Sequence, residues 1–333
     1  MSTENTNVKS EDFLKVEDLR VEYTSMGSIV KAVNGVSFEL KRGETLALVG
    51  ETGAGKTSIA KAILRILPDI SATEKGKVEF EGQNLLALKE KDMQLIRGHK
   101  ISMIFQDPMT ALNPTMRIGK QIEEAVLRHN KVTNAEAEVR AREMLELVGI
   151  PADRMNEFPH QFSGGMKQRV VIAIALACNP ELLLADEPTT ALDVTIQAQV
   201  LELINDLKKR MNTSMILITH DLGVVNETCD DVAVVYAGKI IESGSKYEVF
   251  KHPAHPYTNG LFGALPNMNL DAERLHPIDG LPPDPTNLPD GCSFAPRCPY
   301  ATDKCRHGEI ELQDLGKGHF CACVRLDEIG KER

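Results

Sequence analysis

The sequence contains no apolar run long enough to cross a bilayer. The longest, 170–178, has nine residues, whereas a transmembrane helix needs roughly 20. The polar start, 1–12, lacks the apolar segment of a signal peptide. The formal charge of −10 leaves no excess of lysine and arginine to neutralise a nucleic-acid backbone over a wide surface. We therefore expect a cytoplasmic protein that binds no nucleic acid.

A chain of 333 residues can form one large domain with a smaller appendage. We expect a disordered leader over 1–12, a main domain over 13–250 and a C-terminal extension over 251–333. Proline, histidine and asparagine become dense over 251–290, which predicts an extended segment, and the cysteines follow it. The sequence shows no internal repeat and no coiled-coil heptads.

The apolar patterns predict an α/β fold with two additions. Alternation over 13–23 and 32–38 predicts a small antiparallel β layer, with 13–23 at its edge. Short apolar runs separated by a helical stretch predict a mainly parallel core sheet, completed by a hairpin over 231–244. About fifty residues with mostly helical patterns predict a helical subdomain at about 107–165, inserted into the main domain.

A phosphate-binding loop occupies residues 50–57. Their order is Gly50-Glu51-Thr52-Gly53-Ala54-Gly55-Lys56-Thr57, which fits G-x-x-x-x-G-K-[ST]. A buried-strand pattern enters the loop, and a helical pattern that begins with Ser58 leaves it. In this setting backbone N–H groups and a helix N-terminus bind phosphates, Lys56 reaches the β- and γ-phosphates, and Thr57 offers its hydroxyl to Mg²⁺. The loop predicts binding of a nucleoside triphosphate.

Five further motifs follow in a fixed order. The segment Phe162-Ser163-Gly164-Gly165-Met166-Lys167-Gln168-Arg169 resembles the signature motif of the ATP-binding cassette (ABC) family, with Met166 where glutamine is more usual. The run Leu182-Leu183-Leu184-Ala185-Asp186-Glu187 resembles that family's Walker B strand. The other matches are Gln106 to the Q-loop glutamine, Ala191-Leu192-Asp193 to the D-loop and His220 to the switch histidine. Tyr23 stands where the family places an adenine-stacking aromatic residue.

The resemblance implies ATP hydrolysis by a cassette over about 13–250. It implies that ATP contacts Tyr23 and the loop residues through Ser58, and that Thr57, Gln106 and Asp186 bind Mg²⁺. Glu187 would polarise the attacking water, with Lys56, Gln106 and His220 as the other catalytic residues. The residues expected to complete the ATP site of a second cassette are Ser163, Gly164, Gly165, Met166 and Asp193. Burial of Asp186 at the end of an apolar strand agrees, because a buried carboxylate needs a compensating charge.

Cassette ATPases serve importers, exporters, DNA repair and translation. Features that the other classes need and this sequence lacks favour the importers. The chain lacks a long coiled-coil insertion, a second ATPase unit and membrane spans of its own. The segments His255-Pro256-Tyr257-Thr258, Gly260-Leu261-Phe262-Gly263-Ala264-Leu265-Pro266 and Ala111-Leu112-Asn113-Pro114 resemble ATPase subunits of dipeptide/oligopeptide importers.

That resemblance implies a protein on the inner face of the cell membrane. Its partners would be two permease subunits, a sister ATPase or a second copy of itself, and indirectly an extracytoplasmic peptide-binding protein. Nickel chelates or opines are alternative cargoes. An alternative to a transporter subunit is a soluble cassette ATPase with a redox-sensing or cluster-handling role.

Five of the seven cysteines lie between Cys292 and Cys323. In a reducing compartment such crowding favours a metal or cluster site over disulfides. In peptide-importer ATPases this segment carries a [4Fe–4S] cluster in some members, which implies the ligands Cys292, Cys298, Cys305 and Cys323, with Cys321 as the alternative fourth. Spacings of five, six and seventeen residues lack the paired C-x₂-C of structural zinc and favour the cluster. Zn²⁺ and free thiols stay as the other interpretations.

Overall fold

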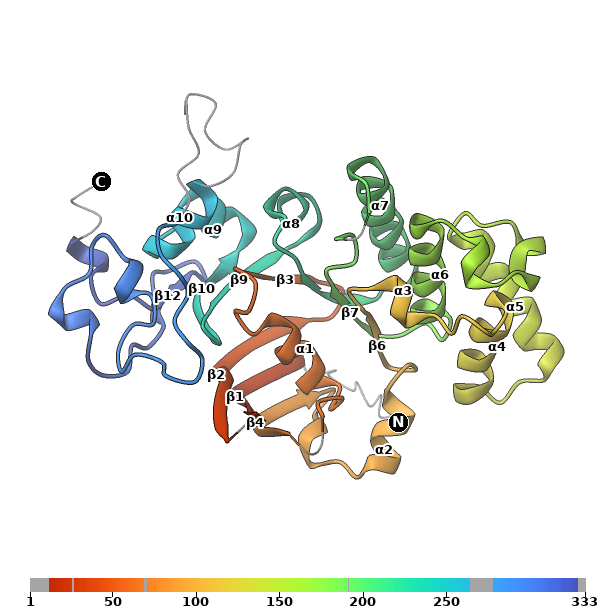
Figure 1. The fold of residues 1–333 in the computed structure, drawn as a ribbon, viewed down its shortest axis with the longest axis horizontal. Helices are drawn as coiled ribbons and strands as arrows, with labels where there is room; N and C mark the ends of the chain where they lie inside the picture. The colour runs from red at the N-terminus through yellow and green to blue at the C-terminus, as the bar shows by residue number, and fades with distance from the viewer. Residues whose placement is uncertain (1–11, 26, 69–70, 191, 264–277, 329–333) are drawn as a thin grey trace, which may run out of the picture.

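The computed structural model describes residues 12–25, 27–68, 71–190, 192–263 and 278–328 (Figure 1). Residues 1–11 of the expected leader, Ala191 of the expected D-loop, and Ala264-Leu265-Pro266 of the tail motif lie outside the described residues. Asp12, the last residue of the expected leader, instead begins the first strand. The strands are β1 (Asp12–Ser25), β2 (Ser28–Lys41), β3 (Thr45–Val49), β4 (Ala72–Phe80), β5 (Gln83–Asn84), β6 (Ile101–Ile104), β7 (Leu182–Asp186), β8 (Ser214–Ile218), β9 (Asp231–Tyr236), β10 (Lys239–Ser245), β11 (Gln313–Asp314) and β12 (Phe320–Cys321). The α-helices are α1 (Lys56–Ile63), α2 (Glu90–Ile96), α3 (Pro108–Ala111), α4 (Ile118–His129), α5 (Asn134–Leu147), α6 (Gly164–Leu176), α7 (Val194–Met211), α8 (Leu222–Thr228), α9 (Lys246–Lys251) and α10 (Pro256–Gly263). Short 3₁₀ turns are η1 (Leu85–Ala87), η2 (Ala152–Asn156), η3 (Pro159–Gln161), η4 (Ala295–Arg297) and η5 (Asp303–Cys305).

The antiparallel layer has the strand order β2-β1-β4-β5, which confirms the predicted layer. The prediction that its first strand lies at an edge was wrong, because β1 pairs with β2 on one side and β4 on the other. The sequence of β4, ATEKGKVEF, has four charged residues among nine, and only Val78 and Phe80 are buried. A strand of this composition gives a weak apolar signal, so its pairing was not foreseen.

The core sheet has the order β11-β12-β10-β9-β3-β8-β7-β6, with β9, β3, β8, β7 and β6 parallel. Both faces are covered: Leu46 and Leu48 of β3 pack into one apolar cluster, and Ala47 and Val49 into the other. Coverage on both faces explains why the strand is apolar throughout. The predicted hairpin is confirmed, since β9 and β10 pair antiparallel around Ala237-Gly238.

Helices α4, α5 and α6 gather at one end of the molecule and the C-terminal extension at the other (Figure 1). Helix α5 begins with a capping box: Thr133 Oγ1 accepts from the Glu136 N–H at 3.3 Å, and the Glu136 carboxylate accepts from the Thr133 N–H at 2.7 Å. It ends at Leu147, and Gly149, two residues later, has a φ of +76°. Within the described ranges, no helix has the length and apolar character needed to span a membrane.

The extension continues the core sheet, because β12 pairs antiparallel with β10 and places Cys321 opposite Glu242. Glu242 is fully buried, and its carboxylate accepts from the backbone N–H groups of Ala254 and His255 at 2.7 and 2.8 Å. His319 Nε2 lies 2.8 Å from the same carboxylate. One buried side chain of β10 therefore connects the main domain to two parts of the extension.

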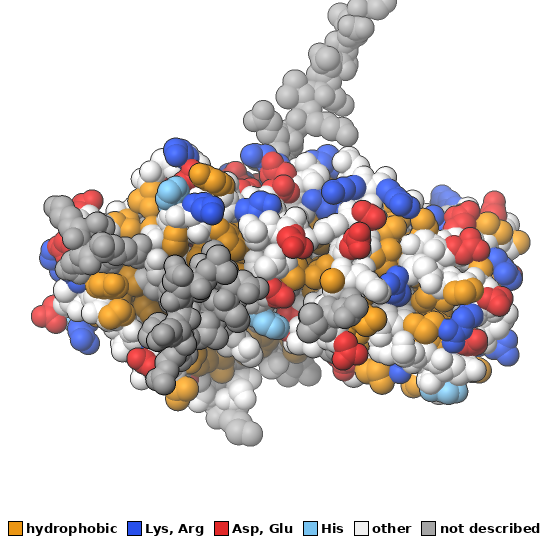
Figure 2. Space-filling model, turned by 90° about the horizontal axis from the view of Figure 1, so that it is seen from above, with side chains coloured by type: hydrophobic (Ala, Val, Ile, Leu, Met, Phe, Trp, Pro, Cys, Tyr) orange, Lys and Arg blue, Asp and Glu red, His pale blue; other side chains and the backbone are white. Residues whose placement is uncertain are grey.

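Figure 2 shows the face of the molecule seen from above, with acidic and basic side chains interspersed across it. This mixture matches the modest negative charge of the whole chain. A stable electrostatic interaction with a polyanion needs basic side chains gathered on one surface. The face in Figure 2 shows no such gathering of basic side chains.

Candidate nucleotide-binding site

The phosphate loop connects β3 to α1 and depends on glycine at two close approaches. At Gly50, with φ of +151°, a Cβ would lie 2.1 Å from the Val235 carbonyl oxygen. At Gly55, with φ of +102°, it would lie 2.3 Å from the Ala32 carbonyl oxygen. A larger residue at either position would have to displace backbone, so the glycines are required for the loop to form.

Lys56 is the first residue of α1, and its ammonium lies within the loop. Its Nζ donates to the carbonyl oxygens of Gly50 and Glu51 at 2.8 and 2.9 Å. Burial lowers the pKa of Lys56, while the carboxylates of Glu187, Asp186 and Glu51 act in the opposite direction. The ammonium is therefore poorly solvated, and its hydrogen bonds among the described residues go to two neutral carbonyls, an arrangement suited to exchange for a phosphate oxygen.

Asp186 ends β7 beside the start of α1. Its side chain is buried, and Thr57 Oγ1 donates to Asp186 Oδ1 at 3.0 Å. Burial raises the pKa of Asp186, an effect that the Thr57 hydrogen bond opposes. A hydroxyl and a carboxylate next to a phosphate loop are the oxygen ligands that Mg²⁺ takes at nucleotide sites.

Glu187 is the point at which three loops meet. Its carboxylate accepts from Gln106 Nε2 at 2.7 Å and from Thr190 Oγ1 at 3.0 Å, and His220 Nδ1 lies 3.6 Å from Oε1. Its backbone has φ of +44°, and its N–H donates to the Ile218 carbonyl at 2.9 Å. The structure thus brings Gln106, Glu187 and His220 together. Sequence reasoning missed Thr190, which follows the Walker B run without a motif of its own.

Tyr23 lies in β1 next to the phosphate-loop helix. Its hydroxyl and Ser58 Oγ are 3.0 Å apart and share a hydrogen bond. The side chain is only half-buried, although it packs against the apolar cluster beneath the antiparallel layer. The ring is therefore placed beside the loop with part of its surface free for stacking.

The signature residues lie on a different part of the fold. Ser163 caps α6, its Oγ accepting from the Met166 N–H at 3.4 Å, and Asp193 is exposed just before α7. At Gly165 a Cβ would lie 2.8 Å from Ile196 Cγ2, so the glycine allows close packing of α6 against α7. In the part of the chain that the structure describes, no hydrogen bond or ion pair joins Ser163 to the phosphate loop.

Two family models match the chain. The model described as ABC transporter matches residues 33–190, and the one described as oligopeptide/dipeptide transporter, C-terminal region, matches residues 241–305. The dipeptide transport ATP-binding protein DppD of Bacillus subtilis is 53% identical over 292 residues, covering 87% of each chain. This chain belongs to the ABC transporter ATPases.

A further relative of this ABC ATPase and two solved structures similar to it point to the same family. The oligopeptide transport ATP-binding protein OppD of Bacillus subtilis is 55% identical, covering 86% of this chain and 82% of its own. A solved dimeric post-hydrolysis state of the ATP-binding cassette MJ0796, bound to ADP and Pi, has a TM-score of 0.63 at 26% identity, covering 70% of this chain and 98% of that one. CbiO1 from Clostridium perfringens has a TM-score of 0.62 at 28% identity, covering 73% and 92%. The predicted cassette fold is confirmed.

Four cysteines of this ABC ATPase line one small pocket in the extension: Cys292, Cys298, Cys305 and Cys323. Cys321 lies outside the described lining and is fully buried beside it. All are free thiols, and burial raises the pKa of Cys298 to about 11. Among the described residues, no three His, Cys, Asp or Glu side chains are positioned to share a metal ion. Within the described ranges the four thiols therefore line one pocket but form no site for a single metal ion.

Proposed function

We propose that this chain is the nucleotide-binding subunit that hydrolyses ATP to drive import of dipeptides or oligopeptides through two partner membrane subunits. The match of residues 241–305 to the oligopeptide/dipeptide transporter C-terminal region supports this cargo class. The observation that carries the hydrolytic part is the convergence of Gln106, Glu187 and His220 beside the Thr57–Asp186 pair. We place the protein on the cytoplasmic side of the membrane, where ATP is available.

The contacts suggest a role for each side chain. Thr57 and Asp186 would hold Mg²⁺, which neutralises phosphate charge when it is bound. Lys56 would leave its two carbonyl partners for the β- and γ-phosphates. Glu187 would accept a hydrogen bond from the attacking water and polarise it, while His220 keeps the Glu187 carboxylate oriented and contacts the γ-phosphate.

A second cassette would complete the site. Ser163 caps a helix, and among the described residues it makes no hydrogen bond to the phosphate loop of its own chain, so its phosphate contacts would be made to the nucleotide of a partner cassette. That partner is either a second copy or a homologous sister subunit. Gln106 joins Glu187 to the helical subdomain, which would carry the change in the nucleotide site to the membrane subunits.

Replacement of Glu187 by glutamine tests the hydrolytic assignment. The amide keeps the shape of the side chain but is no base, so hydrolysis should fall by about 100-fold or more, with ATP binding intact and an ATP-dependent dimer accumulating on gel filtration. Glu202→Gln, at an exposed position of α7, is the control and should hydrolyse ATP normally. Hydrolysis at the wild-type rate by Glu187→Gln would remove this residue from its role.

We also propose that Cys292, Cys298, Cys305 and Cys323 bind a [4Fe–4S] cluster. Their shared pocket supports this, as does the chemistry of four thiols. One Zn²⁺ with Zn–S bonds of about 2.3 Å needs sulfurs about 3.8 Å apart, and the described cysteines form no such group. A cluster takes each thiolate on a separate iron and so accepts wider spacing.

Metal analysis after anaerobic purification tests the cluster. We expect about four iron atoms per chain, with the brown colour lost in Cys298→Ala and Cys323→Ser but retained in Cys321→Ser. Stoichiometric zinc, or no metal in the wild type, would refute the cluster and leave the ATPase assignment unaffected. A redox-sensing cassette without a transporter is the competing function that the cysteine pocket favours, and failure to co-purify with membrane subunits would support it.

A further inference from the structure

The C-terminal extension reaches the phosphate loop through an ion pair. Arg297 Nη1 and Nη2 donate to Glu51 Oε2 and Oε1 at 2.7 and 3.0 Å, so the two planar groups meet in a bidentate pair. The Arg297 side chain is 4% exposed and that of Glu51 is 29% exposed. Arg297 also donates to the carbonyl oxygens of Asp279 and Ile278 at 2.9 and 3.2 Å. The guanidinium is thus held in one orientation, and a bidentate pair transmits that orientation to its partner.

The backbone of Glu51 is held as well as its side chain. Its N–H donates to Tyr257 Oη at 2.9 Å, and its carbonyl oxygen accepts from Lys56 Nζ at 2.9 Å. Tyr257 is fully buried, its ring centroid 4.5 Å from that of Tyr236, whose hydroxyl accepts from Arg297 Nη1 at 3.3 Å. Glu51 therefore connects the extension directly to the lysine of the phosphate loop.

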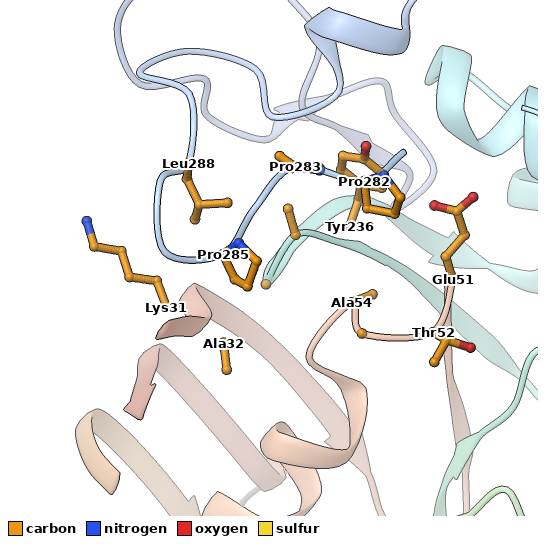
Figure 3. Close-up of a pocket in the computed structure, with 13 residues that line it drawn as sticks. Lys31, Ala32, Glu51, Thr52, Ala54, Tyr236, Pro282, Pro283, Pro285 and Leu288 are labelled. Atoms are coloured by element: carbon orange, nitrogen blue, oxygen red, sulfur yellow. The ribbon is translucent and has the colours of Figure 1, made fainter. Parts of the chain in front are cut away.

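A second attachment lies on the other side of the loop. Figure 3 shows Pro282, Pro283 and Pro285 of the extension facing the phosphate loop and β2 across a small pocket. The Lys31 N–H of β2 donates to the Pro285 carbonyl at 2.9 Å. Because proline restricts the backbone, this segment is stiff. The extension is thereby attached to the main domain at a second point besides the Arg297–Glu51 pair, which favours transmission of its position to the loop.

We propose that Arg297 is a positioning residue of the phosphate loop. By holding the Glu51 carboxylate it keeps the loop backbone at Glu51 in one conformation before ATP binds, and this preorganisation raises the affinity for ATP. The inference rests on the proposed role of the loop as the ATP site. Since Arg297 directly precedes Cys298, the cysteine pocket is one residue away from this contact.

The dissociation constant of Mg-ATP, measured by calorimetry with the full chain, tests the proposal. All variants carry Glu187→Gln so that hydrolysis does not interfere. Arg297→Gln should raise the dissociation constant by about fivefold or more, the usual scale of coupling between sites. Arg297→Lys keeps the charge but not the planar fork, so it should restore part of the affinity. Arg306→Gln is the matched control, since Arg306 is 59% exposed and paired with Asp303, and it should bind ATP normally.

Hydrogen exchange provides a readout that a merely structural role would not move. Coupling is reciprocal, so Mg-ATP should slow exchange in residues 278–305 of the parent protein and of Arg306→Gln but not of Arg297→Gln. If Arg297→Gln does not fold, Glu51→Gln removes the same ion pair from the loop side and should give the same two results.

Two outcomes distinguish a failure of the phosphate loop as the ATP site from a failure of the role proposed for Arg297. Unchanged ATP affinity in Lys56→Ala would overturn the loop as the ATP site. Loss of binding in Lys56→Ala, together with wild-type affinity and retained exchange protection in Arg297→Gln and Glu51→Gln, would overturn the role of Arg297 alone. An equal loss of affinity in Arg306→Gln would also refute it, because the effect would then be general to the extension.

Discussion

The buried imidazole of His255 should make the protein lose stability in mild acid. His255 is 1% exposed, its Nδ1 accepts from the Tyr257 N–H at 3.0 Å, and burial lowers its pKa from 6.5 to about 4. The nearby carboxylate of Glu242 acts in the opposite direction but is the smaller effect. Between these two pKa values the unfolded chain binds more protons than the folded one, so stability falls as the pH falls.

The size of the effect follows from the pKa difference. A shift of about 2.5 units at about 1.4 kcal/mol per unit corresponds to about 3 kcal/mol when the transition is complete. About 2 kcal/mol of this is lost between about pH 7 and about pH 5, because the folded pKa has not yet been reached.

Urea unfolding at several pH values checks this prediction. His255→Asn removes the titrating group and should flatten the pH dependence by about 2 kcal/mol over that interval. His252→Asn, at an exposed position three residues earlier, should keep the wild-type dependence. The same pH dependence in His255→Asn and the wild type would show that another group is responsible and would refute the reasoning.

Three further predictions concern the phosphate loop and its neighbours. Lys56→Ala should raise the dissociation constant of ATP by about tenfold or more, because a charge-assisted hydrogen bond contributes about 1.5–3 kcal/mol; calorimetry measures it. Gly55→Ala should lower the melting temperature, because its Cβ would lie 2.3 Å from the Ala32 carbonyl at a φ of +102°; an unchanged melting temperature would contradict the described loop. Tyr23→Phe should bind ATP within about twofold of wild type while Tyr23→Ala weakens binding about fivefold or more, since stacking needs only the ring. Equal losses in both would instead point to the hydroxyl contact with Ser58.

The local motifs were predictable because each is contiguous and its physics is local. The phosphate loop needs glycine where backbone approaches backbone, as Gly50 and Gly55 show, and a lysine at the start of a helix. The hairpin at Ala237-Gly238 is likewise local, because both residues have positive φ, as a tight turn between antiparallel strands requires. The helix start at Thr133 is set by two hydrogen bonds within four residues.

Contacts between distant segments were decided only by the tertiary structure. Arg297 and Glu51 are 246 positions apart, and neither has a sequence pattern that pairs it with the other. The sequence left Cys321 and Cys323 as alternatives, since two cysteines so close in the chain satisfy the same spacing. Pairing of β12 with β10 separates them, burying Cys321 beside the pocket while Cys323 lines it.

The distinction between local motifs and contacts of distant segments applies to the whole protein. The sequence by itself determined the family and the chemistry of ATP binding, because order and spacing of short motifs carry that information. The tertiary structure decided how the C-terminal extension meets the phosphate loop, because an ion pair, a tyrosine hydroxyl and an added strand come from segments that only folding brings together.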